Sequence, residues 1–84
     1  MKYMEIKKIK SQIWISDYVI TFGYDTKRHN HKKQQRVITT INKHYAQKDF
    51  WLWINTINED KPYRAMANVT ILDIEEINGR YINL

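Results

Sequence analysis

The segment 50–57, with the sequence FWLWINTI, constrains the fold of this chain more than any other stretch. Its first five side chains, from Phe50 to Ile54, are all large and apolar. Successive side chains of a β-strand point to opposite faces, so a strand here is apolar on both faces. Such a strand is covered on both faces in the folded protein. We therefore predict a central strand, with Trp51 and Trp53 on the face opposite Phe50.

The length of 84 residues predicts one small domain, 1–84, with a single core. The chain has no cysteine, so packing rather than disulfides must stabilise it. Residues 1–10 mix lysines with apolar side chains and predict no signal peptide, because they contain no continuous apolar segment. No stretch of the sequence approaches the roughly 20 apolar residues of a membrane-spanning helix. We expect a cytoplasmic domain with no membrane partner.

Strand patterns recur along the chain, and residues 18–24 alternate most clearly between large apolar and smaller side chains. Gly23 inside this segment predicts a bulge or bend. The pairs Ser16-Asp17 and Asn78-Gly79 predict turns. We expect short strands over 13–15, 18–24, 36–47, 50–57, 63–69 and 69–77. Five or six short antiparallel strands favour a mainly β fold, a small SH3- or Sm-like barrel.

The segment 36–47 has two interpretations. Its β-branched run VITTI favours a strand, because β-branched side chains lose χ1 freedom in a helix. The apolar side chains also fall at helical spacing, which favours one helix around 32–46 with Asn30 as a possible N-cap. An α+β fold, with one helix on an antiparallel sheet, is therefore the alternative to the barrel.

The order of these motifs resembles the YolD-like family. The likeness consists of YVITFGYD, a polar loop, RVITTIN, FWLWINT, a second loop and VTILDIEEI. In the last motif, Ile71, Ile74 and Ile77 look like the family's closing x-I-x-x-I element. The resemblance implies a small Sm-like barrel of the kind found in bacteria, prophages and plasmids, often beside error-prone polymerases. The chain lacks the N-terminal helical segment and the tryptophan-proline-type motif of that family, so no functional residues carry over.

Basic residues concentrate in the middle of the chain, within a formal net charge of +5. Seven Lys or Arg and no acidic residue lie between Thr26 and Lys48. Clustered basic side chains neutralise phosphates, and neighbouring aromatic rings stack on exposed bases. We predict contacts with DNA or RNA through Lys27, Arg28, Lys32, Lys33, Arg36 and Tyr45, with Tyr24 as a further aromatic. The alternative is that the polar segment 25–35 is only a solvated loop or a long hairpin tip.

Trp51 and Trp53 indicate a second kind of surface. Tryptophan is enriched at the energetic centres of protein interfaces, and exposed apolar patches rarely go unused. The two indoles therefore belong to the core, to a homodimer interface or to a binding surface for another protein. A phage or mobile-element accessory protein that binds or inhibits a host protein complex through these residues is the alternative function.

No motif in the sequence indicates catalysis or a cofactor. The sequence contains no Ser-His-Asp signature, no glycine-rich phosphate loop and no H-E-x-x-H pattern. His29 and His31 have H-x-H spacing, but they lie among Lys27, Arg28 and Lys32, which repel a divalent cation. We therefore predict a non-enzymatic binding module without a metal.

Overall fold

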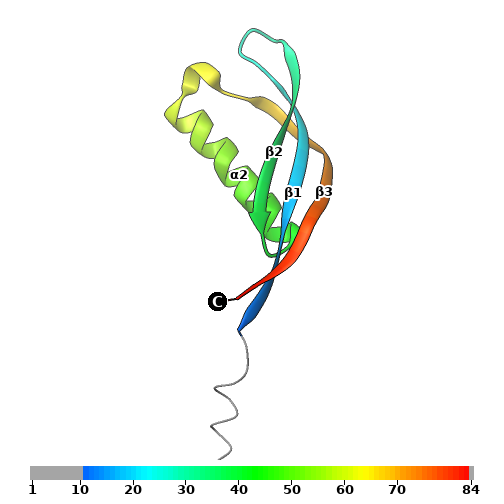
Figure 1. Ribbon diagram of the computed structural model, residues 1–84. Coiled ribbons are helices and arrows are strands. Elements are labelled where there is room, and N and C mark those ends of the chain that lie inside the picture. Colours follow the sequence, from blue (N-terminus) through cyan, green and yellow to red (C-terminus); the bar gives the residue numbers. More distant parts are fainter. Residues whose placement is uncertain (1–10, 84) are drawn as a thin grey trace, which may run out of the picture.

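The computed structural model describes residues 11–83 as three strands, one α-helix and one 3-10 turn. In chain order these are β1 (Gln12–Asp25), β2 (His31–Thr40), α2 (Lys43–Asp60), η1 (Pro62–Arg64) and β3 (Ala67–Asn83). The strands form one antiparallel sheet in the order β2-β1-β3. Helix α2 lies across one face of this sheet (Figure 1).

The predicted barrel is wrong, and the α+β alternative describes the observed fold class. Within residues 11–83 the sheet has three strands and stays open, with β2 and β3 at its edges. Strand β1 is 14 residues long and includes the predicted strands 13–15 and 18–24. Strand β3 is 17 residues long and includes the predicted strand 69–77, whereas most of the predicted strand 63–69 precedes β3, with Tyr63 and Arg64 in η1. Because these strands are long, the chain has too few residues to form the five or six strands of the predicted barrel.

The turns predicted at Ser16-Asp17 and at Asn78-Gly79 lie inside strands. Ser16-Asp17 is part of β1, and Ser16 is fully buried. Asn78-Gly79 is part of β3, where the pairing with β1 shifts in register between Ile15 and Asp17. Asn78 has a φ of 55°, a left-handed conformation that asparagine tolerates better than most residues. The Asn-Gly pair therefore makes a β-bulge within one strand, not a turn between two.

The segment 50–57 is helical, which corrects the predicted central strand. Ala46, Phe50 and Ile54 are buried at intervals of four residues, and Trp53 and Ile57 pack partly against the same core. This stripe has the period of an α-helix. Five consecutive apolar residues do not show that period, because they make about one and a half helical turns and point in all directions around the helix axis.

Helix α2 begins later than the helix of the α+β alternative. Residues 32–40 belong to β2, so the predicted helix around 32–46 overlaps α2 only at its end. The N-cap is Asn42 rather than Asn30, because Asn42 Oδ1 accepts a hydrogen bond of 3.0 Å from the backbone N–H of Tyr45. The VITTI run is in strand conformation up to Thr40, as its β-branched side chains favour.

The core lies between β1 and α2. Every second residue of β1 from Tyr18 is buried on the face that α2 covers. Phe22 and Phe50 are both fully buried and meet edge to face, with ring centroids 4.9 Å apart. Full burial of a side chain of this size contributes about 1.5–3 kcal/mol. The buried apolar residues are Tyr18, Ile20, Phe22, Tyr24, Ala46, Phe50, Ile54 and Met66.

A proline and an asparagine determine how the chain leaves α2. Pro62 disfavours helical backbone at Lys61, so the helix ends at Asp60 and the turn η1 follows. The side chain of Asn58 then makes two hydrogen bonds to Met66, accepting from its N–H at 2.8 Å and donating to its carbonyl at 3.2 Å. These contacts hold η1 beside the end of α2.

Within residues 11–83, no helix has the length and apolar character needed to cross a membrane. The expectation that no signal peptide is present concerns residues 1–10, which lie outside the described part of the chain. The cytoplasmic location therefore stays a prediction.

Candidate nucleic-acid interface

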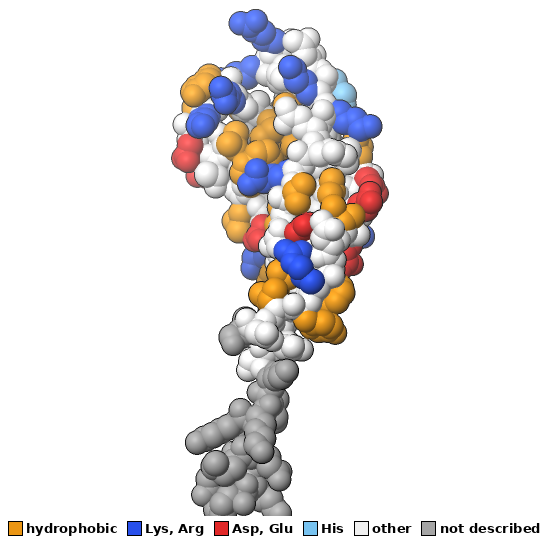
Figure 2. Space-filling view, viewed as in Figure 1, with side chains coloured by type: hydrophobic (Ala, Val, Ile, Leu, Met, Phe, Trp, Pro, Cys, Tyr) orange, Lys and Arg blue, Asp and Glu red, His pale blue; other side chains and the backbone are white. Residues whose placement is uncertain are grey.

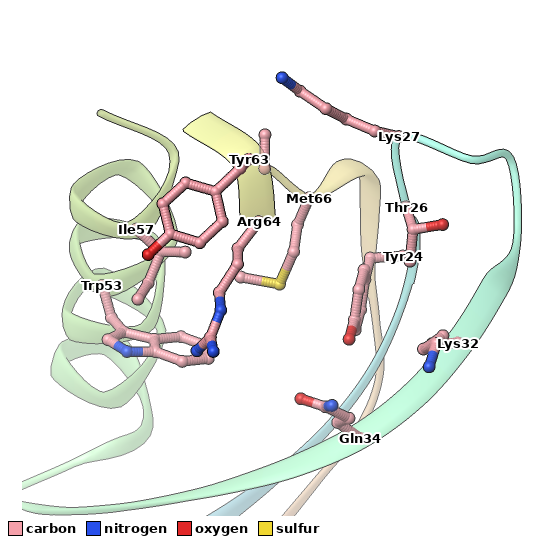
Figure 3. Close-up of a pocket in the computed structure, with 11 residues that line it drawn as sticks. Tyr24, Thr26, Lys27, Lys32, Gln34, Trp53, Ile57, Tyr63, Arg64 and Met66 are labelled. Carbon is pink, nitrogen blue, oxygen red and sulfur yellow. The ribbon is translucent and has the colours of Figure 1, made fainter. Parts of the chain in front are cut away.

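A hollow of about 360 Å³ lies between the β1–β2 hairpin, the last turns of α2 and η1 (Figure 3). Its lining combines aromatic, aliphatic and basic side chains from these elements: Tyr24, Thr26, Lys27, Lys32, Gln34, Trp53, Ile57, Tyr63, Arg64, Ala65 and Met66. A second hollow of about 430 Å³ continues it along the hairpin tip and adds Arg28 and Asn30. We call the two together the basic groove. Among the described residues, no Asp or Glu lines either hollow.

The hairpin tip positions two basic residues at one end of the groove. The tip is short, because Thr26 N–H donates to the Asn30 carbonyl at 2.9 Å and His29 N–H donates to the Thr26 carbonyl at 2.9 Å. Lys27 and Arg28 lie within this turn and are exposed. The segment 25–35 was predicted as a loop or a long hairpin tip. Only residues 26–30 form the hairpin tip, since Asp25 ends β1 and residues 31–35 belong to β2.

Strand alternation separates the two neighbouring lysines of β2. Lys32 pairs with Tyr24, whose side chain is buried on the α2 face, and Lys32 lines the groove. Lys33 pairs with Gly23 and points to the opposite face of the sheet. His31 is on that opposite face as well, where its ring lies over Gly23. The structure therefore assembles Lys27, Arg28 and Lys32 but not Lys33.

Arg36 and Trp53 form a wall next to the groove. The Arg36 guanidinium carbon lies 4.1 Å from the centroid of the Trp53 ring, within the range of a cation–π contact. Arg36 is half-buried on the α2 face of β2, opposite Ile20, and its Nε is buried without a hydrogen-bond partner among the described residues. Trp53 also packs on Phe22, with ring centroids 5.9 Å apart. Trp53 therefore lines the groove, whereas Arg36 lies beside it and lines neither hollow.

Of the other predicted aromatics, Tyr24 of β1 lines the groove, whereas Trp51 and Tyr45 lie elsewhere on α2. Trp51 and Trp53 point about 200° apart because an α-helix has 3.6 residues per turn, so they do not share one face. Trp51 is 39% exposed and touches Phe50 at its edge. Tyr45 is exposed in the first turn of the helix, whereas the groove lies at the last turns. Tyr45 is therefore not part of the groove.

Tyr63 and Arg64 are groove residues that the sequence did not predict. The turn η1 carries both of them, and the Asn58–Met66 hydrogen bonds fix that turn. Tyr63 is 70% exposed, and Arg64 points into the hollow (Figure 3). The local signal was the Lys61-Pro62 pair, which ends a helix and starts a turn, followed by an aromatic and a basic residue.

The groove carries a positive charge. Asp25, which is next to the groove residues Tyr24 and Thr26 in sequence, does not neutralise that charge. Asp25 accepts hydrogen bonds from Asn68 at 2.9 Å and from His31 at 3.0 Å, on the face of the sheet away from α2. The bond from Asn68, followed by that from His31, lowers the pKa of Asp25 below its ordinary value. Figure 2 shows Lys and Arg side chains around the hairpin and η1 end, with hydrophobic side chains between them.

Residues 11–83 contain no group of three or more His, Cys, Asp or Glu arranged to hold a metal ion. His29 lies in the hairpin tip and His31 bonds to Asp25, so the H-x-H pair is divided between two environments.

No known family model, curated protein or solved structure matches this chain. The resemblance to the YolD-like family stays a prediction, and the barrel it implies is not the observed fold. The function must therefore be inferred from the groove itself.

Proposed function

We propose that this domain is a non-enzymatic binding module that holds the backbone of DNA or RNA in the basic groove. The observation that carries the proposal is the composition of the groove, where Lys27, Lys32 and Arg64 from separate elements line one hollow and no carboxylate is among its described lining residues. Phosphate groups bind such clusters chiefly through the release of condensed counterions. We place this activity in the cytoplasm, which fits a chain without cysteine.

The shape of the charged surface supports a polymer rather than a single anion. The second hollow extends the first along the hairpin and adds Arg28, so the basic side chains form a path and not one point. A chain of phosphates can engage several of these cations at once. Each phosphate contact adds roughly 0.7 to the slope of log affinity against log salt for a single strand, and about 0.9 for B-DNA.

The test compares two adjacent lysines that differ only in the face they occupy. Lys32→Glu places a carboxylate in the groove, whereas Lys33→Glu places one on the opposite face and changes the net charge equally. Binding to labelled oligonucleotides is measured by fluorescence anisotropy at several salt concentrations. We expect Lys32→Glu to weaken binding on the order of tenfold and to reduce the salt slope, with Lys33→Glu close to the wild type.

Two results contradict the proposal. One is the absence of binding by the wild-type protein at low salt. The other is an equal loss in both variants, because that result shows attraction to the net charge of the protein and not to the groove.

A protein partner is the second candidate, and the exposure of α2 favours it. Trp51 is 39% exposed and Leu52 is 55% exposed, although an outward helix position is normally polar. Under this alternative Trp51→Ala abolishes the association with a host protein while Lys32→Glu leaves it intact. Recovery of one stoichiometric partner by the wild type but not by Trp51→Ala is the expected result.

A further inference from the structure

The part of the basic groove beneath Tyr63 has the walls of a base-binding site. We propose that it holds one unpaired nucleobase, so that the ligand class is single-stranded nucleic acid. This inference rests on the proposed function and specifies which nucleic acid the groove selects.

Aromatic side chains from three elements face the same hollow. Tyr24 comes from β1, Trp53 from α2 and Tyr63 from η1, and Figure 3 shows them around one space. Ile57 and Met66 add aliphatic side chains to the lining. A volume of about 360 Å³ lies within the range of roughly 300–1,000 Å³ that small-molecule sites occupy. A nucleobase is a flat aromatic ligand that can stack on such aromatic side chains.

The charged side chains of the hollow lie on different sides of this apolar part. Lys27 and Lys32 come from the hairpin, whereas Arg64 extends from η1 across the hollow toward Trp53 (Figure 3), and its guanidinium carbon lies 5.9 Å from the Tyr63 ring centroid. A planar guanidinium stacks on a base as an aromatic ring does, so Arg64 offers an inserted base a second stacking surface. A nucleotide in a strand has one phosphate on each side, and the basic side chains can contact these phosphates when the base is inserted. Gln34 lines the hollow as well, and its amide offers both a donor and an acceptor to the edge of a base.

A base within a duplex cannot enter such a hollow without leaving its stack. Unpairing and unstacking a base costs free energy, and this cost is smallest for a base that is already in a single strand. The stacking of an unpaired base on an aromatic side chain is sequence-tolerant, because every base presents a π-face. The groove is therefore expected to prefer single strands without a strong sequence preference.

The experiment compares three ligands of equal length at one low salt concentration: an oligothymidylate, an abasic strand with the same phosphates, and a duplex. We expect the oligothymidylate to bind the wild-type protein at least about fivefold more tightly than the other two. Tyr63→Ala is expected to remove this advantage. Tyr81→Ala is the matched control, since Tyr81 is 66% exposed against 70% for Tyr63 and lies outside the groove.

A spectroscopic readout tests the same contact. In a Trp14→Phe/Trp51→Phe background, Trp53 is the only indole of the chain. The Arg36 guanidinium carbon already lies 4.1 Å from the centroid of this ring, so we expect a base to approach the part of Trp53 that lines the hollow. Its fluorescence should be changed by the oligothymidylate and not by the abasic strand, because only a base enters the hollow.

The outcomes separate this inference from the proposed function. Equal binding of all three ligands, unaffected by Tyr63→Ala, overturns base insertion and leaves backbone binding intact. Failure of all three ligands to bind overturns both. Tighter binding of the duplex than of the oligothymidylate also overturns the single-strand inference alone.

Discussion

Individual polar side chains, more than hydrophobic ones, decide where the groove residues lie. Asn58 is the clearest case, because its one amide both accepts from and donates to the backbone of Met66 across a gap of eight residues in sequence. That bridge sets the position of η1 and therefore of Tyr63 and Arg64. The hydrophobic core explains why α2 covers the sheet but does not explain the path of this turn.

Asn58→Ala is expected to destabilise the fold by about 1–3 kcal/mol, because it leaves a partly buried N–H and carbonyl of Met66 without partners. Urea denaturation measures the change in the free energy of unfolding. Asn55→Ala is the control, since Asn55 is exposed on the same helix, and it should be near neutral. Equal stability of both variants would show that the bridge has no part in holding η1.

Glu76 is expected to contribute to the loss of stability in acid. The Ser16 hydroxyl, followed by the Trp14 indole N–H at 3.2 Å, donates to Glu76 and lowers its pKa below the ordinary 4.5. The folded pKa lies below the unfolded one, so this stabilisation is complete above pH 4.5 and is lost as the pH falls through the lowered folded value.

The measurement is the free energy of unfolding between neutral pH and about pH 3 for the wild type and Glu76→Gln. The glutamine still accepts from Ser16 and Trp14 but does not titrate, so the variant should lose less stability on acidification. Asp17 and Asp25, whose pKa values are also lowered by hydrogen bonds, retain the remaining acid dependence. Parallel curves for the two proteins would rule out a role for Glu76.

The basic groove residues that lie in the β1–β2 hairpin could be predicted from the sequence. A run of basic residues without acids is visible in the sequence, and Lys27, Arg28 and Lys32 all line the groove. The face on which Lys33 lies depends on strand register, and the polar segment 25–35 contains no apolar residue from which a register could be predicted. Tyr45 was expected beside the basic residues on a strand over 36–47, but it lies in the first turn of α2.

At the scale of elements, the start of α2 depends on a single cap. Asn42→Ala removes the acceptor for the Tyr45 N–H and should cost about 1 kcal/mol of stability, within a usual range of 0.5–2. Asn42→Asp keeps an acceptor and adds a favourable negative charge at the helix N-terminus, so it should be at least as stable as the wild type. Thermal and urea denaturation of the three proteins test this order, which a loss of stability in Asn42→Asp would contradict.

Two elements were predictable in part and for different reasons. The alternation of residues 18–24 is clear because β1 is central and one of its faces carries the core. The segment 50–57 of α2 has the pattern of a strand that is apolar on both faces. The core-facing Trp53 and Ile54 are adjacent and follow the exposed Leu52, so the apolar run has no polar position that reveals the helical period. A window that extends from Ala46 to Ile57 shows the helical period that the shorter one concealed.

At the scale of the whole molecule, the groove exists only where three distant segments meet. Its aromatic walls come from positions 24, 53 and 63, which are brought together by the packing of α2 on the sheet and by the turn after it. No local pattern encodes that meeting, so the sequence indicated a basic surface but not a hollow. The molecular surface is asymmetric as a result, with the aromatic groove on the α2 side of the sheet and Lys33 on the other.

The most direct test of this asymmetry is a titration of the isotopically labelled protein with a short oligothymidylate, followed by amide and indole chemical shifts. We expect the largest shift changes at Lys27, Lys32, Tyr63 and Arg64 and at the indole of Trp53, with Lys33 and Trp51 little affected. Changes centred on Trp51, or spread evenly over both faces of the sheet, would contradict a nucleic-acid site in the groove.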